Sequence, residues 1–143
     1  MALSPVAAAR LADAILVLHT SIVVFVVAGT AAIVVGAWRG WAWVHGFAWR
    51  LAHVLLMAFI ALQAWRGALC PLTVWEQALR TRAGQPVYSE SFVAHWLSRV
   101  LFHDAPWWAF VAAYSAFTLL VVGLWVFVPP RRARHPVRSR QAR

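Results

Sequence analysis

Three long apolar runs constrain the fold of this chain more than any other feature. The first covers residues 11–36 and is interrupted only by Asp13 and His19. At about 1.5 Å per helical residue, it exceeds the roughly 30 Å hydrocarbon core of a bilayer and can cross it with some tilt. The second and third runs cover about residues 44–66 and 107–128. The pattern predicts an all-α integral membrane protein with about three transmembrane helices.

The composition agrees with a membrane protein. The 143 residues are 63% hydrophobic and 12% charged, whereas soluble domains average roughly 45–50% apolar and 25% charged residues. The length suits one domain, so we expect a single membrane-embedded helical domain over residues 1–130. A cleaved signal peptide is the alternative for the first run, but its apolar region would be far longer than the usual 7–15 residues or so.

A mixed segment, residues 67–106, separates the second and third runs, and we expect it to be external with one or two short amphipathic helices. Thr73 and Glu76 have the spacing of a capping box, which predicts a helix that starts at Thr73 and ends at Gly84. A second helix, about residues 91–103, has one apolar face but is too short to cross a bilayer. Asp104 is predicted to cap the third span, with Pro106 in its first turn.

Positive charge is densest after residue 130 and orients the chain. The formal net charge is +9, and all the basic side chains are arginines. The positive-inside rule places the tail, residues 131–143, in the cytoplasm, where we expect it to be disordered. Its arginines suit anionic lipid headgroups, and no nucleic acid is needed to explain them. We therefore expect a multi-pass protein of the bacterial cytoplasmic (inner) membrane with its C-terminus inside.

Two histidines within the spans are candidate cofactor ligands, because ionisable groups in a membrane are costly. If the first two spans form an antiparallel hairpin, position 53 faces roughly position 23. His19 and His53 then differ in depth by about 6 Å, and Met57 lies near the level of His19. Such groups on facing helices suit the axial positions of haem b, and they also suit a quinone or a proton relay. The alternative is that each histidine hydrogen-bonds a neighbouring helix.

Other polar residues have simpler interpretations. We expect Asp13 and Arg50 to reach the membrane interface along their apolar stems. Cys70 follows the second span, where burial is favoured over a reactive thiol or an intermolecular disulfide. His95, with Glu90, His103 and Asp104, lacks a recognised metal-ligand spacing and is expected to be solvated. Small residues at positions 28, 32 and 36 allow close helix packing, either within the bundle or against another membrane protein.

A family resemblance covers roughly residues 11–128. Its most specific part is the string Cys70-Pro71-Leu72-Thr73 with Glu76, directly after an apolar helix. The other residues that carry it are Leu11-Ala12-Asp13, Leu18-His19, Arg50, His53, Leu79, Arg80, Gly84, Tyr88, Phe92 and His95. These resemble the bacterial membrane family catalogued as domain of unknown function 2784, and the arginine tail lies outside the match. The resemblance implies a membrane protein and directs attention to Asp13, His19, Arg50, His53, Cys70, Glu76 and His95, without implying an activity.

Two functional hypotheses follow from these observations. The first is a small accessory or interaction subunit of the cytoplasmic membrane, without catalysis of its own, that contacts membrane lipids and another membrane protein. The second is a haem b- or quinone-binding redox protein that uses His19 and His53, with Met57 as a further ligand. A transporter is disfavoured because the spans carry few charges.

Overall fold

The computed structural model describes residues 3–89, 91–93, 95–96 and 106–131. These residues form α1 (Pro5–Arg39), the 3₁₀ turn η1 (Ala42–His45), α2 (Phe47–Trp65), α3 (Pro71–Arg82) and α5 (Trp107–Phe127). The described part of the chain contains no strand, and only an isolated bridge joins Gly46 to Arg131. Because α1, α2 and α5 are long and apolar enough to cross a membrane, the predicted fold class is confirmed.

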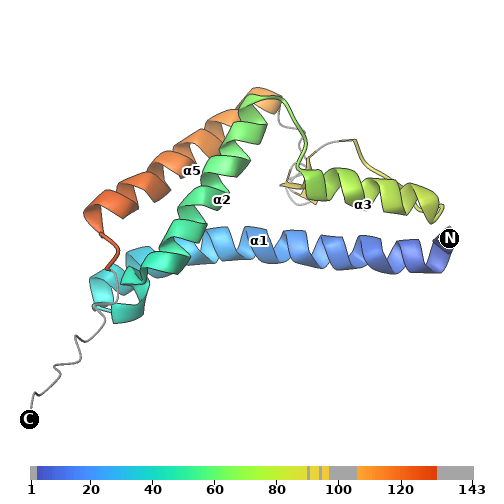
Figure 1. Ribbon diagram of the computed structural model, residues 1–143. Coiled ribbons are helices and arrows are strands. Elements are labelled where there is room, and N and C mark those ends of the chain that lie inside the picture. Colours follow the sequence, from blue (N-terminus) through green and yellow to red (C-terminus); the bar gives the residue numbers. More distant parts are fainter. Residues whose placement is uncertain (1–2, 90, 94, 97–105, 132–143) are drawn as a thin grey trace, which may run out of the picture.

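The helices form two antiparallel pairs (Figure 1). In the first pair, α3 lies along the N-terminal half of α1, where Arg80 contacts Asp13. In the second, α5 returns beside α2. The Trp107 indole N–H donates to the Ala64 carbonyl near one end of this pair, and Arg50 donates to the Leu124 carbonyl near the other.

The two pairs diverge from the C-terminal end of α1, where η1 turns the chain. Helix α2 leaves this end at a steep angle instead of folding back along α1 (Figure 1). The predicted hairpin of the first two spans is therefore wrong. The reason is that α3 packs along the N-terminal half of α1 and covers the surface that α2 would contact in such a hairpin.

The start of α3 differs from the prediction. The helix begins at Pro71, and its N-cap, Cys70, makes no side-chain capping bond. Proline suits the first helical position because its missing N–H would have had no helical partner there. Thr73 is fully buried inside the helix, and Glu76 accepts from the Arg80 guanidinium. The predicted capping box is therefore wrong.

The end of α3 is as predicted. Gly84 has a φ of +69°, a conformation that glycine adopts without steric cost. Its N–H donates to the Thr81 carbonyl at 3.1 Å, and the Gln85 N–H donates to the Arg80 carbonyl at 2.9 Å. These two bonds form a Schellman motif.

The other helix ends are described in part. Helix α1 starts at Pro5, before the predicted span, and the Ser4 hydroxyl accepts from the Ala7 N–H. Pro106 is the N-cap of α5 and lies just outside its first turn. The predicted cap Asp104, most of the predicted helix 91–103 and the tail after residue 131 lie outside the described residues.

Very little of the apolar surface is internal. A small core forms where α1, α2 and α5 meet, around Val26, Met57 and Val121. Many other large apolar side chains point outward, and Phe127 is 85% exposed. Lipid is the solvent that such surfaces require, so the burial pattern agrees with a membrane protein.

Candidate functional site

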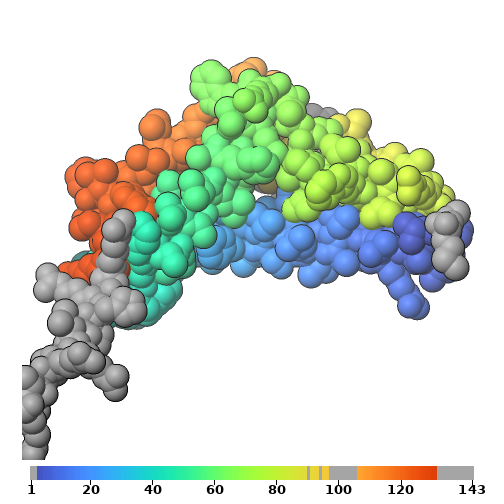
Figure 2. All heavy atoms as spheres, viewed as in Figure 1, coloured from blue at the N-terminus to red at the C-terminus, as the bar shows by residue number. Residues whose placement is uncertain are grey.

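A cavity of about 530 Å³ lies in the space between the diverging helix pairs. Figure 2 shows the surface hollowed where α2, α3 and α1 meet. Most of the wall is apolar, and its polar members are His19, Gln63, Ser91 and Tyr114 with the thiol of Cys70. The volume is within the roughly 300–1,000 Å³ typical of small-molecule sites, which are mostly apolar with a few placed polar groups.

His19 is the most unusual group in this wall. Helix α1 carries it, its side chain is 7% exposed, and its ring stacks on Phe92 with the centroids 4.2 Å apart. Its Nδ1 is buried and has no hydrogen-bond partner among the described residues. Leaving such an atom unpaired costs about 1–3 kcal/mol. Because His19 also lines the cavity, its imidazole is the candidate polar anchor for a molecule bound there.

A network of polar contacts fixes the position of Glu76, a charged residue near His19. The Glu76 carboxylate is 1% exposed and lies within electrostatic range of the His19 imidazole. It accepts from Arg80 Nε at 2.8 Å and from the Tyr88 hydroxyl at 3.0 Å. Arg80 also donates to the exposed carboxylate of Asp13 at 3.3 Å. These contacts hold α3 and the chain around residue 88 against α1.

The charge of Arg80 is secured by these partners. Burial lowers the pKa of Arg80, but the hydrogen bonds and negative charges of Glu76 and Asp13 outweigh it and raise that pKa. A third donor, Nη1, bonds the Gln85 side-chain oxygen at 2.9 Å. The guanidinium is thus fully engaged and permanently charged.

His53 has a different environment, although it is completely buried. Its Nε2 lies 2.9 Å from the Val26 carbonyl oxygen and 3.4 Å from the Thr30 hydroxyl. A Cβ on Gly29 would come within 3.2 Å of the imidazole, so glycine makes this approach possible. This is the interhelical hydrogen bond that was the alternative to cofactor binding.

The structure separates the three predicted cofactor ligands, His19, His53 and Met57. His19 and Met57 line the cavity, whereas His53 is absent from its described wall. The α1 contacts of His53 lie seven to eleven residues beyond His19, roughly 10–16 Å along the helix. The expected depth difference was smaller because α2 was assumed to run alongside α1. The observed contacts do not bring the two imidazoles to one point.

Arg50 is buried inside the protein, so its side chain does not extend outward as expected for snorkelling. Its side chain is 1% exposed and donates to the Leu124 carbonyl at 2.7 Å and the Val44 carbonyl at 3.4 Å. Its guanidinium also lies 5.9 Å from the centre of the Trp125 ring. The late carbonyls of a helix attract a cation, so Arg50 joins α2 to η1 and to the C-terminal end of α5.

The remaining predicted residues are divided between the cavity and the outer insert. Cys70 is half-buried, makes no disulfide and lies in the cavity wall beside Pro71. His95 stacks on Tyr88 with the centroids 4.0 Å apart. The described residues contain no group of three His, Cys, Asp or Glu side chains placed to hold a metal ion. Glu90, His103 and Asp104 lie outside the described residues.

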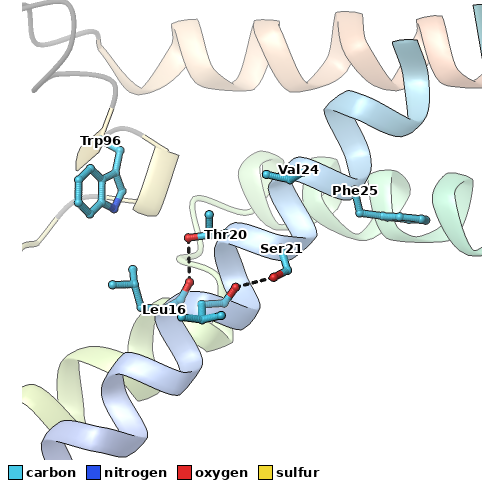
Figure 3. Close-up of a pocket in the computed structure, with 7 residues that line it drawn as sticks. Leu16, Thr20, Ser21, Val24, Phe25 and Trp96 are labelled. Carbon is cyan, nitrogen blue, oxygen red and sulfur yellow. Dashed lines mark hydrogen bonds between the residues drawn. The ribbon is translucent and has the colours of Figure 1, made fainter. Parts of the chain in front are cut away.

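A second hollow lies on the outward face of α1 (Figure 3). Leu16, Val24, Phe25 and Trp96 line it, with two hydroxyl-bearing residues between them. The hydroxyls of Thr20 and Ser21 donate to carbonyls of their own helix at 2.9 and 2.8 Å. This hollow lacks a buried, unpaired polar atom such as His19 Nδ1, and its composition suits contact with lipid chains.

Some site residues are not apparent from the sequence. Arg80 lies four residues after Glu76, a spacing that indicates an ion pair on one helix face. Gln63, Ser91 and Tyr88 have no comparable signal, because separate elements bring them to the cavity or the polar network. Tyr114 shares a side-chain hydrogen bond with Ser91, a contact that depends on how α5 and the outer insert meet.

Comparison with known proteins identifies a family but no activity. Neither the curated proteins nor the solved structures contain a match to this chain. Residues 9–130 match the family described as "Protein of Unknown function (DUF2784)". The match extends over both helix pairs and the cavity, in agreement with the resemblance seen in the sequence. The chain belongs to this family.

Proposed function

We propose that this protein binds a small, membrane-soluble molecule in the cavity between α1, α2, α3 and α5. One observation carries the proposal: an apolar cavity of about 530 Å³ has the buried imidazole of His19 in its wall, and Nδ1 has no partner among the described residues. Apolar walls favour a ligand drawn from lipid, and a few polar groups, His19 among them, orient it. Such binding suits either a sensor or an accessory subunit and requires no catalysis.

The cellular setting is part of the proposal. The charge distribution supports a cytoplasmic (inner) membrane location in a bacterium, with the arginines after residue 130 inside and contacting anionic lipid headgroups. The polar network of α3 then lies on the outer side. A ligand would enter the cavity laterally from the bilayer.

A matched pair of substitutions on α5 tests ligand binding. Ala113 lines the cavity, whereas the neighbouring Ala112, which is exposed as Ala113 is, is not among the lining residues. We expect Ala113→Trp to fill the cavity and remove most of a co-purifying ligand, measured by mass spectrometry of extracts from mildly solubilised protein. Ala112→Trp should retain it. Equal retention in two well-folded variants would refute the proposed site.

Haem b is a second candidate because His19 and Met57 both line the cavity. Imidazole and thioether are suitable axial ligands for haem iron. Visible spectra of oxidised and reduced protein, from cells supplied with haem precursors, provide the test. A Soret band lost in His19→Ala and Met57→Ala but retained in His53→Ala would support haem. A colourless, folded preparation would exclude it and leave the apolar ligand.

A further inference from the structure

We propose that the cavity binds an uncharged quinone-class ring, with a ring carbonyl accepting a hydrogen bond from His19. This inference rests on the proposed ligand-binding function and names its chemical class. Three properties of the site lead to it: the charges around the wall, the aromatic side chains in it, and the unpaired imidazole nitrogen.

The charges favour a neutral headgroup. No arginine is among the described residues that line the cavity, and the chain has no lysine. The nearby cation, Arg80, is already bound to Glu76, Asp13 and Gln85. A carboxylate or phosphate buried in the cavity would lack a counter-charge among the described lining residues. Burying such an unpaired anion is costly, so fatty acids and phospholipid headgroups fit poorly.

The aromatic side chains favour a flat ring. Phe92 stacks on His19 at the cavity wall, and Phe59, Trp75, Trp107 and Phe117 are also lining residues. Aromatic groups pack well against the face or edge of another ring. The aliphatic part of the wall, which includes Ile22 and Val27, suits an alkyl or isoprenoid tail. A quinone combines these two parts with oxygen acceptors that carry no net charge.

His19 supplies the polar recognition. An imidazole N–H donates readily to a carbonyl oxygen. We therefore assign His19 as the residue that contacts the ligand. The Ser91–Tyr114 hydroxyl pair places a second polar group in the same cavity wall.

Binding of decylubiquinone to the protein in lipid nanodiscs tests the ligand class. Quenching of tryptophan fluorescence reports binding, because Trp75 and Trp107 line the cavity. We expect His19→Leu to weaken binding about tenfold, the effect of one lost hydrogen bond in a dry site. The control is Thr20→Val, on the next residue, whose hydroxyl bonds only its own helix. It should bind as the unaltered protein does.

Competition with other lipids separates this inference from the proposed function. Dodecanoate and dodecyl phosphate should displace decylubiquinone about tenfold less effectively than menadione does. If either anion competes as well as menadione, the quinone assignment is wrong. Ligand binding in the cavity is tested separately, by whether Ala113→Trp removes the bound molecule.

The infrared carbonyl band of ¹³C-labelled quinone tests the role of His19. A hydrogen bond from His19 should lower the carbonyl frequency, and His19→Leu should return it to the value in lipid. His19→Asn, which keeps a side-chain N–H, should recover part of the shift. An undiminished shift in His19→Leu would overturn the contact.

Discussion

Histidines 19 and 53 show how two buried side chains of one type differ in what they can do. His53 lies in the crossing of α1 and α2, and its Nε2 is already engaged by the Val26 carbonyl. His19 lies on the cavity wall with Nδ1 unpaired among the described residues. The Nδ1 of His53 is also buried and unpaired among the described residues. The difference between the two histidines is therefore one of place, because only His19 is among the described residues that line the cavity.

Arg50 should be a major determinant of stability. Arg50→Ala would remove the donor to the Leu124 carbonyl and leave empty volume beside Trp125. We expect a loss of about 3 kcal/mol in the free energy of unfolding, measured by thermal denaturation in detergent with circular dichroism. Arg50→Lys should lose less, because it keeps a cation near the helix end. Unchanged stability in Arg50→Ala would contradict this role.

The two carboxylates on Arg80 should contribute unequally. Asp13 is exposed, with its side chain at 64% relative exposure, so Asp13→Asn should cost at most about 1 kcal/mol. Arg80→Met would leave Glu76 buried without its cation and should cost about 3–5 kcal/mol. Urea or thermal unfolding of the two variants in detergent measures the difference. Equal losses would show that the buried pair is not the important one.

The same ion pair also predicts a pH response. The pKa of Arg80 is raised in the folded state, so its stabilising effect is complete below the unfolded pKa and is lost only as the pH rises through the folded one. Both lie above the neutral range. The contribution of Arg80 to stability should therefore be constant between about pH 6 and 9. The comparison is made in a Glu76→Gln background, so that no buried carboxylate titrates when Arg80→Met is added. A stability difference between these two variants that shrinks as the pH rises across this range would contradict the assignment.

At the scale of the elements, the junction after α1 directs α2 away from it. Gly36 lies under the turn, where an added Cβ would meet Val44 Cγ1 and come within 2.9 Å of Trp41. Arg131 N–H donates to the His45 carbonyl at 2.6 Å, which ties the chain after α5 to the same turn. The divergence of the helix pairs, and so the cavity, depends on this packing.

Two glycine substitutions test the junction. Gly36→Ala should destabilise the protein by about 1–3 kcal/mol, because the buried Val44 must move. Gly123, inside α5, has nothing within 4 Å of an added Cβ, so Gly123→Ala should be neutral or stabilise by up to about 1 kcal/mol. Thermal unfolding of both variants in one detergent gives the comparison. A destabilising Gly123→Ala would show that this part of α5 is packed more tightly.

At the scale of the whole molecule, three helices long and apolar enough to cross a membrane predict that the two termini lie on opposite sides of it. The positive-inside rule predicts a cytoplasmic C-terminus and an outer α3. In a Cys70→Ser background, Arg82→Cys near the end of α3 should react with a membrane-impermeant maleimide in spheroplasts. A green fluorescent protein fused after Arg143 should fluoresce. Labelling only after permeabilisation would reverse the assigned orientation.

Local sequence information predicted several features well. Apolar length and composition predicted the three spans, and Gly84 predicted the end of α3 because only a residue tolerant of positive φ suits that position. The resemblance centred on Cys70-Pro71-Leu72-Thr73 correctly predicted the family. The start of α3 was missed because Thr73 and Glu76 satisfy a local capping pattern. In the structure Glu76 instead accepts from Arg80, one turn later in the same helix, and from Tyr88 beyond the helix.

Solvent preference and helix-forming pattern are local properties, so the amino-acid order alone was enough to predict a helical membrane protein and to single out His19, Arg50, His53 and Glu76. The angle between the helix pairs cannot be predicted from local sequence. It depends on tertiary packing, namely that of α3 against α1 and that of Val44 against Gly36. That angle separates His19 from His53 and opens the cavity. It therefore determines which histidine lines the cavity, a property that residue spacing along the chain did not contain.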